Sequence, residues 1–343
     1  MASLRPIRLL RRNRSAAAKA APDAGPLFAE IEQLSARNRS SREPGTERRI
    51  RALRHEAGAK LAGAGSGAPD FAKPDYKALP GTDGIPEVQA ADLTPELLRA
   101  AMLRHGSLLV RGVMERERAT AFADEIETAL ESRASLASGG GAAEGYYEEF
   151  DPGPPVDLAL ARKWVGDGGM WAADSPKLMF EMFDAFERCG LRRVIHGYLN
   201  EVPAISIEKC TLRRVMPDSD SAWHQDGAFL GRVRALNVWL SLSRCGDTAP
   251  GLDVVPERME EIVPTGTEGA IFNWSISPQE VEKVTTQTGV VRPIFEPGDA
   301  LLFDEMNLHS TAADPAMPNP RYAIESWFFG LSGFPAEYVP IAY

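Results

Sequence analysis

The motif His224-Gln225-Asp226 constrains the fold of this chain more than any other feature, because it needs a partner from far along the sequence. On an extended segment, His224 and Asp226 leave the same face and can bind one ion. Two histidines and one carboxylate are the ligands of a facial Fe(II) site, which keeps other coordination positions open. The candidate third ligand is His309, 83 positions beyond Asp226 (309 − 226). The fold must therefore bring distant segments together.

The second half of the chain has the alternating pattern of β-strands. In Leu236–Leu242 the aliphatic residues face one way, and Asn237, Trp239 and Ser241 face the other. An apolar face under helices and a semi-polar face around a cavity suit a jelly-roll barrel. The run that begins at Arg321 alternates in the same way, so we expect Arg321 and Trp239 to point into one cavity. An arginine there could pair with a carboxylate through two charge-assisted hydrogen bonds.

Taken together, these segments resemble the phytanoyl-CoA dioxygenase-like family of Fe(II)/2-oxoglutarate oxygenases. The resemblance depends on the order and spacing of its pieces and covers roughly Ala91 to Phe329. It implies an α+β, mainly β fold, with a double-stranded β-helix (jelly-roll, cupin-like) core flanked by helices. The matching pieces are His224-Gln225-Asp226, Leu236–Leu242, Ala249–Pro256, Glu296–Phe303, His309 and Arg321.

The resemblance also implies a role for individual residues. His224, Asp226 and His309 match the catalytic iron ligands, and Arg321 with Thr311 matches the pair that binds the far carboxylate of 2-oxoglutarate. Trp239 is expected to form an aromatic wall of the cosubstrate pocket. Thr211, which shares a strand face with Lys209 and Arg213, is expected to contact the cosubstrate. Gln225 and Asn237 are expected to contact the substrate.

The implied activity is hydroxylation of an unactivated C–H bond in a small-molecule or lipid-like substrate, with O2 consumed and succinate and CO2 released. Family members that have Ala or Gly in place of the carboxylate can chlorinate, so Asp226 favours hydroxylation. Two alternatives remain open. A zinc or manganese hydrolase could use the same three ligands to activate water, although it would have no use for Arg321 beside Thr311. A non-catalytic jelly-roll protein could bind a small molecule.

Composition places the chain among ordinary globular proteins, with 44% hydrophobic and 25% charged residues in 343. No apolar run approaches the about 18 residues that cross a bilayer. The three cysteines, Cys189, Cys210 and Cys245, lack paired spacing, which predicts reduced thiols and a cytoplasmic location. We expect a small-molecule substrate and no specific nucleic-acid partner.

Charge divides the chain unevenly. The net charge is −10, yet residues 1–60 contain 14 Lys or Arg and 6 Asp or Glu. We therefore predict a basic, helical or disordered N-terminal extension and linker at 1–85, followed by the oxygenase domain at 86–343. A short helix is expected at 46–57. Residues 1–22, which contain no acid, form either a solvated extension or an arm in weak contact with an anionic surface or partner.

Local signals predict the remaining elements. Thr94 as a cap and Pro95 in the first turn predict a helix through Arg104. A strand is expected at 107–113, with helices at 115–130 and 175–198. Two irregular segments, 137–155 and 264–288, are candidates to cover the active site. Phe272 and Trp274 lie in the second of them.

Overall fold

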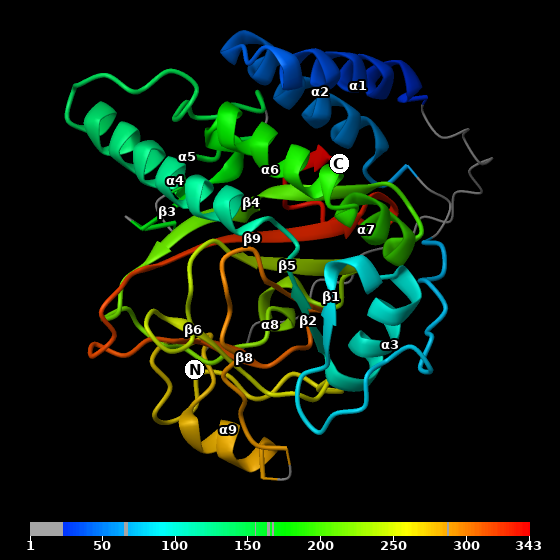
Figure 1. Cartoon of the computed structure of the whole chain (residues 1–343), viewed down its shortest axis with the longest axis vertical. Coiled ribbons are helices and arrows are strands. Elements are labelled where there is room, and N and C mark those ends of the chain that lie inside the picture. The colour runs from blue at the N-terminus through cyan, green and yellow to red at the C-terminus, as the bar shows by residue number, and fades with distance from the viewer. Residues whose placement is uncertain (1–22, 65–67, 155, 163–164, 167, 287) are drawn as a thin grey trace, which may run out of the picture.

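The computed structural model describes residues 23–64, 68–154, 156–162, 165–166, 168–286 and 288–343 (Figure 1). The predicted mixture of helices and antiparallel strands is confirmed. Within these ranges the strands form one large sheet and one two-stranded sheet, without a closed barrel. The expected basic arm at 1–22 lies outside the described residues.

The large sheet is antiparallel except where its first two strands pair in parallel. Its order is β1-β2-β7-β5-β9-β4-β10, with β3 paired to β4, and the small sheet pairs β6 with β8. The strands are β1 (Glu87–Gln89), β2 (Ser107–Arg111), β3 (Gly169–Trp171), β4 (Pro203–Val215), β5 (Ala235–Ser241), β6 (Gly251–Val254), β7 (Ala300–Phe303), β8 (His309–Ala312), β9 (Arg321–Gly330) and β10 (Pro340–Ala342).

The helices lie mainly on one side of the large sheet, and the small sheet lies on the other (Figure 1). They are α1 (Gly25–Ser40), α2 (Pro44–Leu61), α3 (Pro95–His105), α4 (Arg116–Ala137), α5 (Ala159–Arg162), α6 (Pro176–Arg188), α7 (Leu191–Leu199), α8 (Gly227–Leu230) and α9 (Pro278–Val284). None of the described helices is both long enough and apolar enough to cross a membrane.

The two faces of the large sheet build two different cores. Leu236, Val238 and Leu240 of β5 are fully buried in the cluster that includes α3, α4, α6 and α7. Trp239 points to the opposite face and packs with residues of β6, β7 and β9. The alternation predicted for this strand is confirmed, because a strand turns successive side chains to opposite faces.

Helix starts follow their predicted capping residues. The Thr94 hydroxyl accepts a hydrogen bond from the Leu97 amide at 3.1 Å, and Ser175 caps α6 by accepting one from Leu178 at 3.2 Å. Such caps satisfy amide groups that have no partner inside the helix. The helix expected at 115–130 continues to Ala137, and the one expected at 175–198 divides into α6 and α7 around Gly190, whose φ is 77°.

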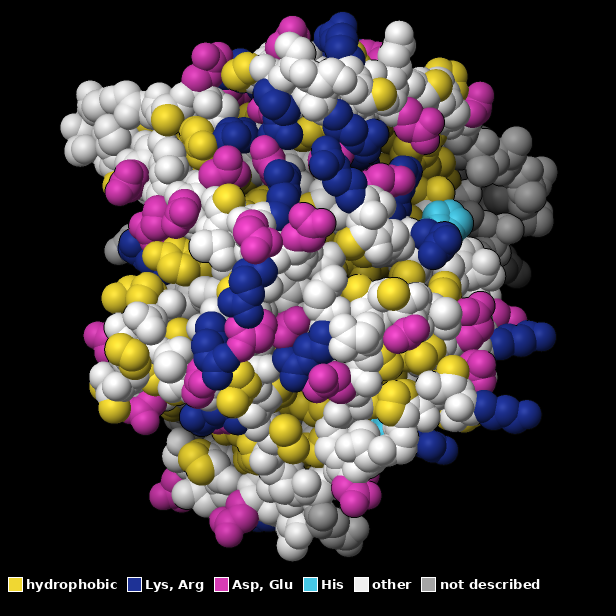
Figure 2. Space-filling model, in the orientation of Figure 1, with side chains coloured by type: hydrophobic (Ala, Val, Ile, Leu, Met, Phe, Trp, Pro, Cys, Tyr) yellow, Lys and Arg dark blue, Asp and Glu magenta, His cyan; other side chains and the backbone are white. Residues whose placement is uncertain are grey.

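The predicted helix at 46–57 is the central part of α2, which packs with α1 against the rest of the fold. Arg54 donates to the Ala342 carbonyl of β10 at 3.0 Å. Arg39 and Arg42 pair with Asp184 and Glu181 of α6, each at 2.5 Å. On the face seen in Figure 2, basic and acidic side chains lie next to one another in the same way. These basic residues are thus paired within the molecule; the division at residue 85 stays a prediction.

The irregular segment at 137–154 does not line the candidate site, so its expected role as a lid is wrong. Glu148 pairs with Arg51 of α2 at 2.7 Å, and Phe150 is buried under the same helix, where the Arg51 guanidinium lies 4.9 Å from its ring centroid. Contacts with α2, far away in sequence, hold the segment on the helical side of the sheet.

Candidate metal centre

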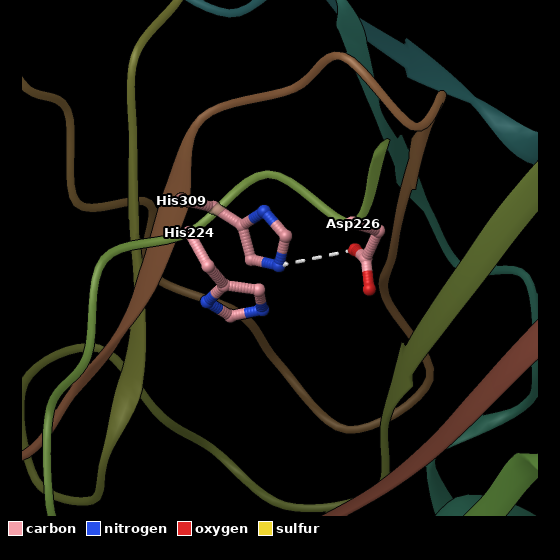
Figure 3. A group of neighbouring side chains, drawn as sticks. All are labelled: His224, Asp226 and His309. Atoms are coloured by element: carbon pink, nitrogen blue, oxygen red, sulfur yellow. Dashed lines mark ion pairs between the residues drawn. The ribbon is translucent and has the colours of Figure 1, made fainter. Parts of the chain in front are cut away.

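His224, Asp226 and His309 converge beside the small sheet (Figure 3). One potential ligand atom from each residue lies within 4.8 Å of the others. His309 Nε2 is 3.8 Å from Asp226 Oδ2, and the two imidazole centroids are 4.4 Å apart. Three donor atoms at these separations can surround one metal ion.

Backbone hydrogen bonds hold the two histidines together. The His224 amide donates to the His309 carbonyl at 2.9 Å, and the His309 amide donates back at 3.1 Å. The segment at 223–224 is extended as expected, but Asp226 has helical backbone angles, with φ −61° and ψ −26°, and directly precedes α8. The expectation of one extended segment is therefore wrong at Asp226: a turn, rather than strand alternation, brings its carboxylate to the histidines.

Each histidine is oriented by a second contact. Nδ1 of His224 lies 2.9 Å from the Ala222 carbonyl, and Nδ1 of His309 lies 3.2 Å from the Asn307 carbonyl. A carbonyl oxygen only accepts, so each Nδ1 is the donor, and each Nε2 is the atom left to bind a metal ion. This is the arrangement in which metal-bound histidines are commonly held.

The electrostatics of the group also fit a cation. Burial lowers the pKa of His309 well below its usual value, and the nearby His224 lowers it further, so His309 is neutral at pH 7. Burial raises the pKa of Asp226, against the opposing effects of His224 and Lys209. A buried carboxylate in this group of ligands carries negative charge that a bound metal ion would balance.

Gln225 has a different position from the one expected of a substrate contact. Its side chain is fully buried and does not line the cavity. Its amide nitrogen donates to the carbonyls of Met306 and Glu261 at 3.0 and 3.2 Å, and its oxygen accepts from the Val263 amide at 2.7 Å. The predicted substrate contact is corrected: Gln225 joins the backbone segments around Asp226.

The three candidate ligands open into a cavity of about 590 Å³ between the two sheets. Thr211, Asn237, Trp239 and Thr311 all line it, as the strand faces predict. Thr211 of β4 and Trp239 of β5 both lie opposite Glu325 of β9, so the three form one row across the sheet. Two buried polar atoms of this lining, Asn237 Oδ1 and Trp239 Nε1, have no hydrogen-bond partner within the described part of the chain.

Arg321 is only 1% exposed and does not belong to the lining of this cavity, so the expectation that it points into the cavity is confirmed for Trp239 alone. It contacts two residues of the lining, Trp239 and Glu325. Its guanidinium carbon is 5.1 Å from the Trp239 ring centroid, and Nη1 donates to the Gly251 carbonyl at 3.2 Å. Its nearest carboxylate belongs to Glu325, 3.8 Å from Nη2, and Nε has no partner among the described residues. Burial lowers the pKa of Arg321. A buried cation with so little compensation fits an anionic ligand.

Two residues without a role assigned from the sequence, Lys209 and Phe229, join the aromatic residues of the expected covering segment at this cavity. Lys209 and Phe229 line the cavity, and Trp274 and Phe272 lie at its mouth. The expectation that the segment 264–288 approaches the site is therefore confirmed. Lys209 shares a strand face with Thr211, and this was the available signal; Phe229, on the short α8, had none.

No protein-family model matches this chain, and no curated protein matches it in sequence. Solved structures similar to it include EctD from S. alaskensis in its apoform, with 16% identity, a TM-score of 0.49, and coverage of 70% of this chain and 79% of that one. EctD with 2-oxoglutarate and 5-hydroxyectoine has 18% identity, a TM-score of 0.47, and coverage of 79% and 86%. SnoK, a non-heme alpha ketoglutarate dependent carbocyclase from nogalamycin biosynthesis, has 14% identity, a TM-score of 0.48, and coverage of 71% and 87%. Similarity at this level assigns no function.

Proposed function

We propose that this protein is an Fe(II)- and 2-oxoglutarate-dependent oxygenase that hydroxylates an unactivated C–H bond of a small molecule. The observation that carries the proposal is the buried Arg321, a cation in contact with Trp239 and Glu325, two residues that line the cavity of His224, Asp226 and His309. A hydrolytic metal site needs no such cation. A cosubstrate with a carboxylate at each end needs both a metal and a distant cation.

The roles of the chain's residues follow from their positions. His224, Asp226 and His309 would hold the iron through two Nε2 atoms and one carboxylate. Arg321 would bind the far carboxylate of 2-oxoglutarate, with the Thr311 hydroxyl as a further donor and Trp239 as a wall. When bound, Fe(II) and 2-oxoglutarate would activate O2, so that one oxygen atom enters the substrate and the other enters succinate as CO2 leaves.

The protein's further contribution would be exclusion of water and orientation of the substrate. The Phe303 ring lies 4.7 Å from the His309 ring and 6.0 Å from the Trp327 ring, so the wall beside the candidate ligands is aromatic. Apolar walls limit the access of bulk water to the reacting groups.

Two further predictions concern the setting of the enzyme. All three cysteines are free, and Cys210 and Cys245 are buried, which supports the proposed cytoplasmic location. Weak contact of the basic arm with an anionic surface stays a prediction, because residues 1–22 lie outside the described chain.

Succinate release tests the proposal. The protein is stripped with a chelator and incubated with Fe(II), ascorbate, 2-oxoglutarate and pools of metabolites, and products are searched by mass spectrometry for a gain of one oxygen. We expect succinate only with Fe(II) and O2. Product formed with Zn(II) in the absence of O2 would support a hydrolase instead. If Fe(II) and 2-oxoglutarate together fail to raise Tm under anaerobic conditions, a non-catalytic binding protein is favoured.

A further inference from the structure

Lys209 is a cation that lines the cavity and lies apart from Arg321. Along β4, Val215 is the residue opposite Arg321, and Lys209 is six positions earlier (215 − 209). At about 3.4 Å per residue this is about 20 Å of strand. The Lys209 ammonium lies 4.4 Å from the Phe229 ring centroid and 5.5 Å from that of Tyr338, whereas the Arg321 guanidinium lies over Trp239. The two positive charges therefore contact different residues of the cavity lining.

Within the described chain, Lys209 has no hydrogen bond and no ion pair, although it is half-buried. Of the neighbouring acids, Asp226 has the largest electrostatic effect on Lys209 but is itself a candidate metal ligand, and two others are engaged elsewhere. Glu208 accepts hydrogen bonds from the Ser206 hydroxyl at 2.7 Å and the Val339 amide at 3.2 Å, and Glu325 pairs with Arg213 at 2.9 Å. An ammonium in a partly apolar cavity is stabilised by a directly paired carboxylate, and no carboxylate of the described chain forms an ion pair with Lys209.

Aromatic rings lie beside the candidate metal centre, and one of them, Phe229, also contacts Lys209. The centroid of the His224 ring lies 6.4 Å from that of Phe229 and 5.6 Å from that of Trp274, which is perpendicular to it. Trp274 stacks on Phe272 with centroids 5.0 Å apart and an interplanar angle of 7°. Phe229 and Trp274 are 43% and 42% exposed. Large aromatic side chains left open to solvent beside a site are typical of ligand-binding surfaces.

We propose that the primary substrate is a small carboxylic acid with a flat apolar body. Lys209 would bind its carboxylate, and Phe229 and Trp274 would contact its body beside His224. This assignment rests on the proposed function, because it leaves Arg321 for 2-oxoglutarate. It gives one carboxylate to each of two cations that lack a close ion pair, Lys209 and Arg321, and it places the apolar body near the candidate iron ligands.

The test compares an acid and its amide as probes. Naphthalene-2-acetate and naphthalene-2-acetamide have the same flat body and differ in charge. Their binding is measured by calorimetry under anaerobic conditions, in the presence of Fe(II) and 2-oxoglutarate. The wild-type protein should bind the acid at least about tenfold more tightly than the amide, as expected for a charge-assisted contact. Lys209→Met should remove this preference, and Lys209→Arg should keep most of it.

Matched controls distinguish the effect of the Lys209 charge on binding from effects of packing and of misfolding. Lys73→Met removes an exposed lysine outside the cavity and should leave the preference unchanged. Trp274→Ala should weaken acid and amide alike. Circular dichroism establishes that each variant is folded.

Three results would overturn the proposal: no binding of the acid to the wild type, equal binding of acid and amide, or a preserved preference in Lys209→Met. Weaker binding of 2-oxoglutarate in Lys209→Met, without a change for the acid, would also refute it by assigning Lys209 to the cosubstrate. Binding of Fe(II) and 2-oxoglutarate is measured first in the same protein. If they bind and the acid does not, only the substrate class fails; if they do not bind, the proposed function fails.

Discussion

Replacing Arg321 with methionine should separate cosubstrate binding from folding. In the absence of ligand, the buried guanidinium has one hydrogen bond, to the Gly251 carbonyl, and a carboxylate at 3.8 Å. Burial lowers its pKa, which means that the charged form is unfavourable at this position. Arg321→Met loses a hydrogen bond that stabilises by about 1 kcal/mol, but it also removes this cost. The free energy of unfolding without ligand should therefore stay the same or rise.

Binding of 2-oxoglutarate should respond in the opposite direction. Removing one partner of a buried, hydrogen-bonded charge pair costs about 2–5 kcal/mol. Arg321 is 1% exposed, so water does not replace the lost contact. At about 1.4 kcal/mol for each factor of ten, the affinity for 2-oxoglutarate should fall at least about 30-fold.

Thermal unfolding with increasing 2-oxoglutarate, in the presence of Mn(II), measures both the stability without ligand and the affinity for 2-oxoglutarate in one titration. The control is Arg292→Met, which removes an arginine that pairs with Asp253 at 2.8 Å outside the cavity lining. The control should bind 2-oxoglutarate like the wild type. Affinity within threefold of wild type in Arg321→Met would refute the role given to this arginine.

Three further substitutions test other parts of the structure. His309→Ala should abolish both the Mn(II)-dependent rise in Tm and succinate formation, whereas His196→Ala, at an exposed histidine outside the cavity, should change neither; a metal response that survives in His309→Ala would contradict the ligand assignment. Gln225→Ala should lower the free energy of unfolding by about 2–4 kcal/mol, measured with urea, because three backbone groups, two of them in buried hydrogen bonds, lose their partner; a loss below 1 kcal/mol would argue against this bridging role. Burial and the neighbouring Asp304 raise the pKa of the Glu305 carboxyl to about 7 in the folded protein. The stability that Glu305 contributes is therefore fully present below the ordinary pKa of glutamate, and it is lost as the pH rises to about 7. Relative to wild type, Glu305→Gln should therefore gain about 3 kcal/mol between pH 4.5 and pH 8, and a pH-independent difference would contradict this.

Strand faces could be predicted well from the sequence, because alternation is a property of one short segment. In β5 the pattern separates Leu236, Val238 and Leu240 from Trp239 without knowledge of any neighbouring strand. The same rule places Thr311 on the face of His309. The meeting of His224 with His309 was predicted only through the resemblance and the chemistry of a metal site.

Features set by distant contacts could not be predicted in the same way. Gln225 turns away from the cavity because its partners, Glu261, Val263 and Met306, come from remote segments. The segment 137–154 lies away from the site because α2 holds it there. Three-residue strands such as β3 and β10 are too short to have a recognisable period.

The reciprocal hydrogen bonds between His224 and His309 connect residues 85 positions apart (309 − 224). Closing a flexible loop of that length costs about 4 kcal/mol in chain entropy, before any constant term. In this protein the loop is already closed before a metal ion binds, because backbone amides and carbonyls that are not metal ligands hold its two ends together. An arriving ion therefore finds its imidazoles assembled, and its binding energy goes into affinity instead of ordering the chain. Loss of the ion should for the same reason be a reversible event that leaves the architecture intact and ready to be reloaded.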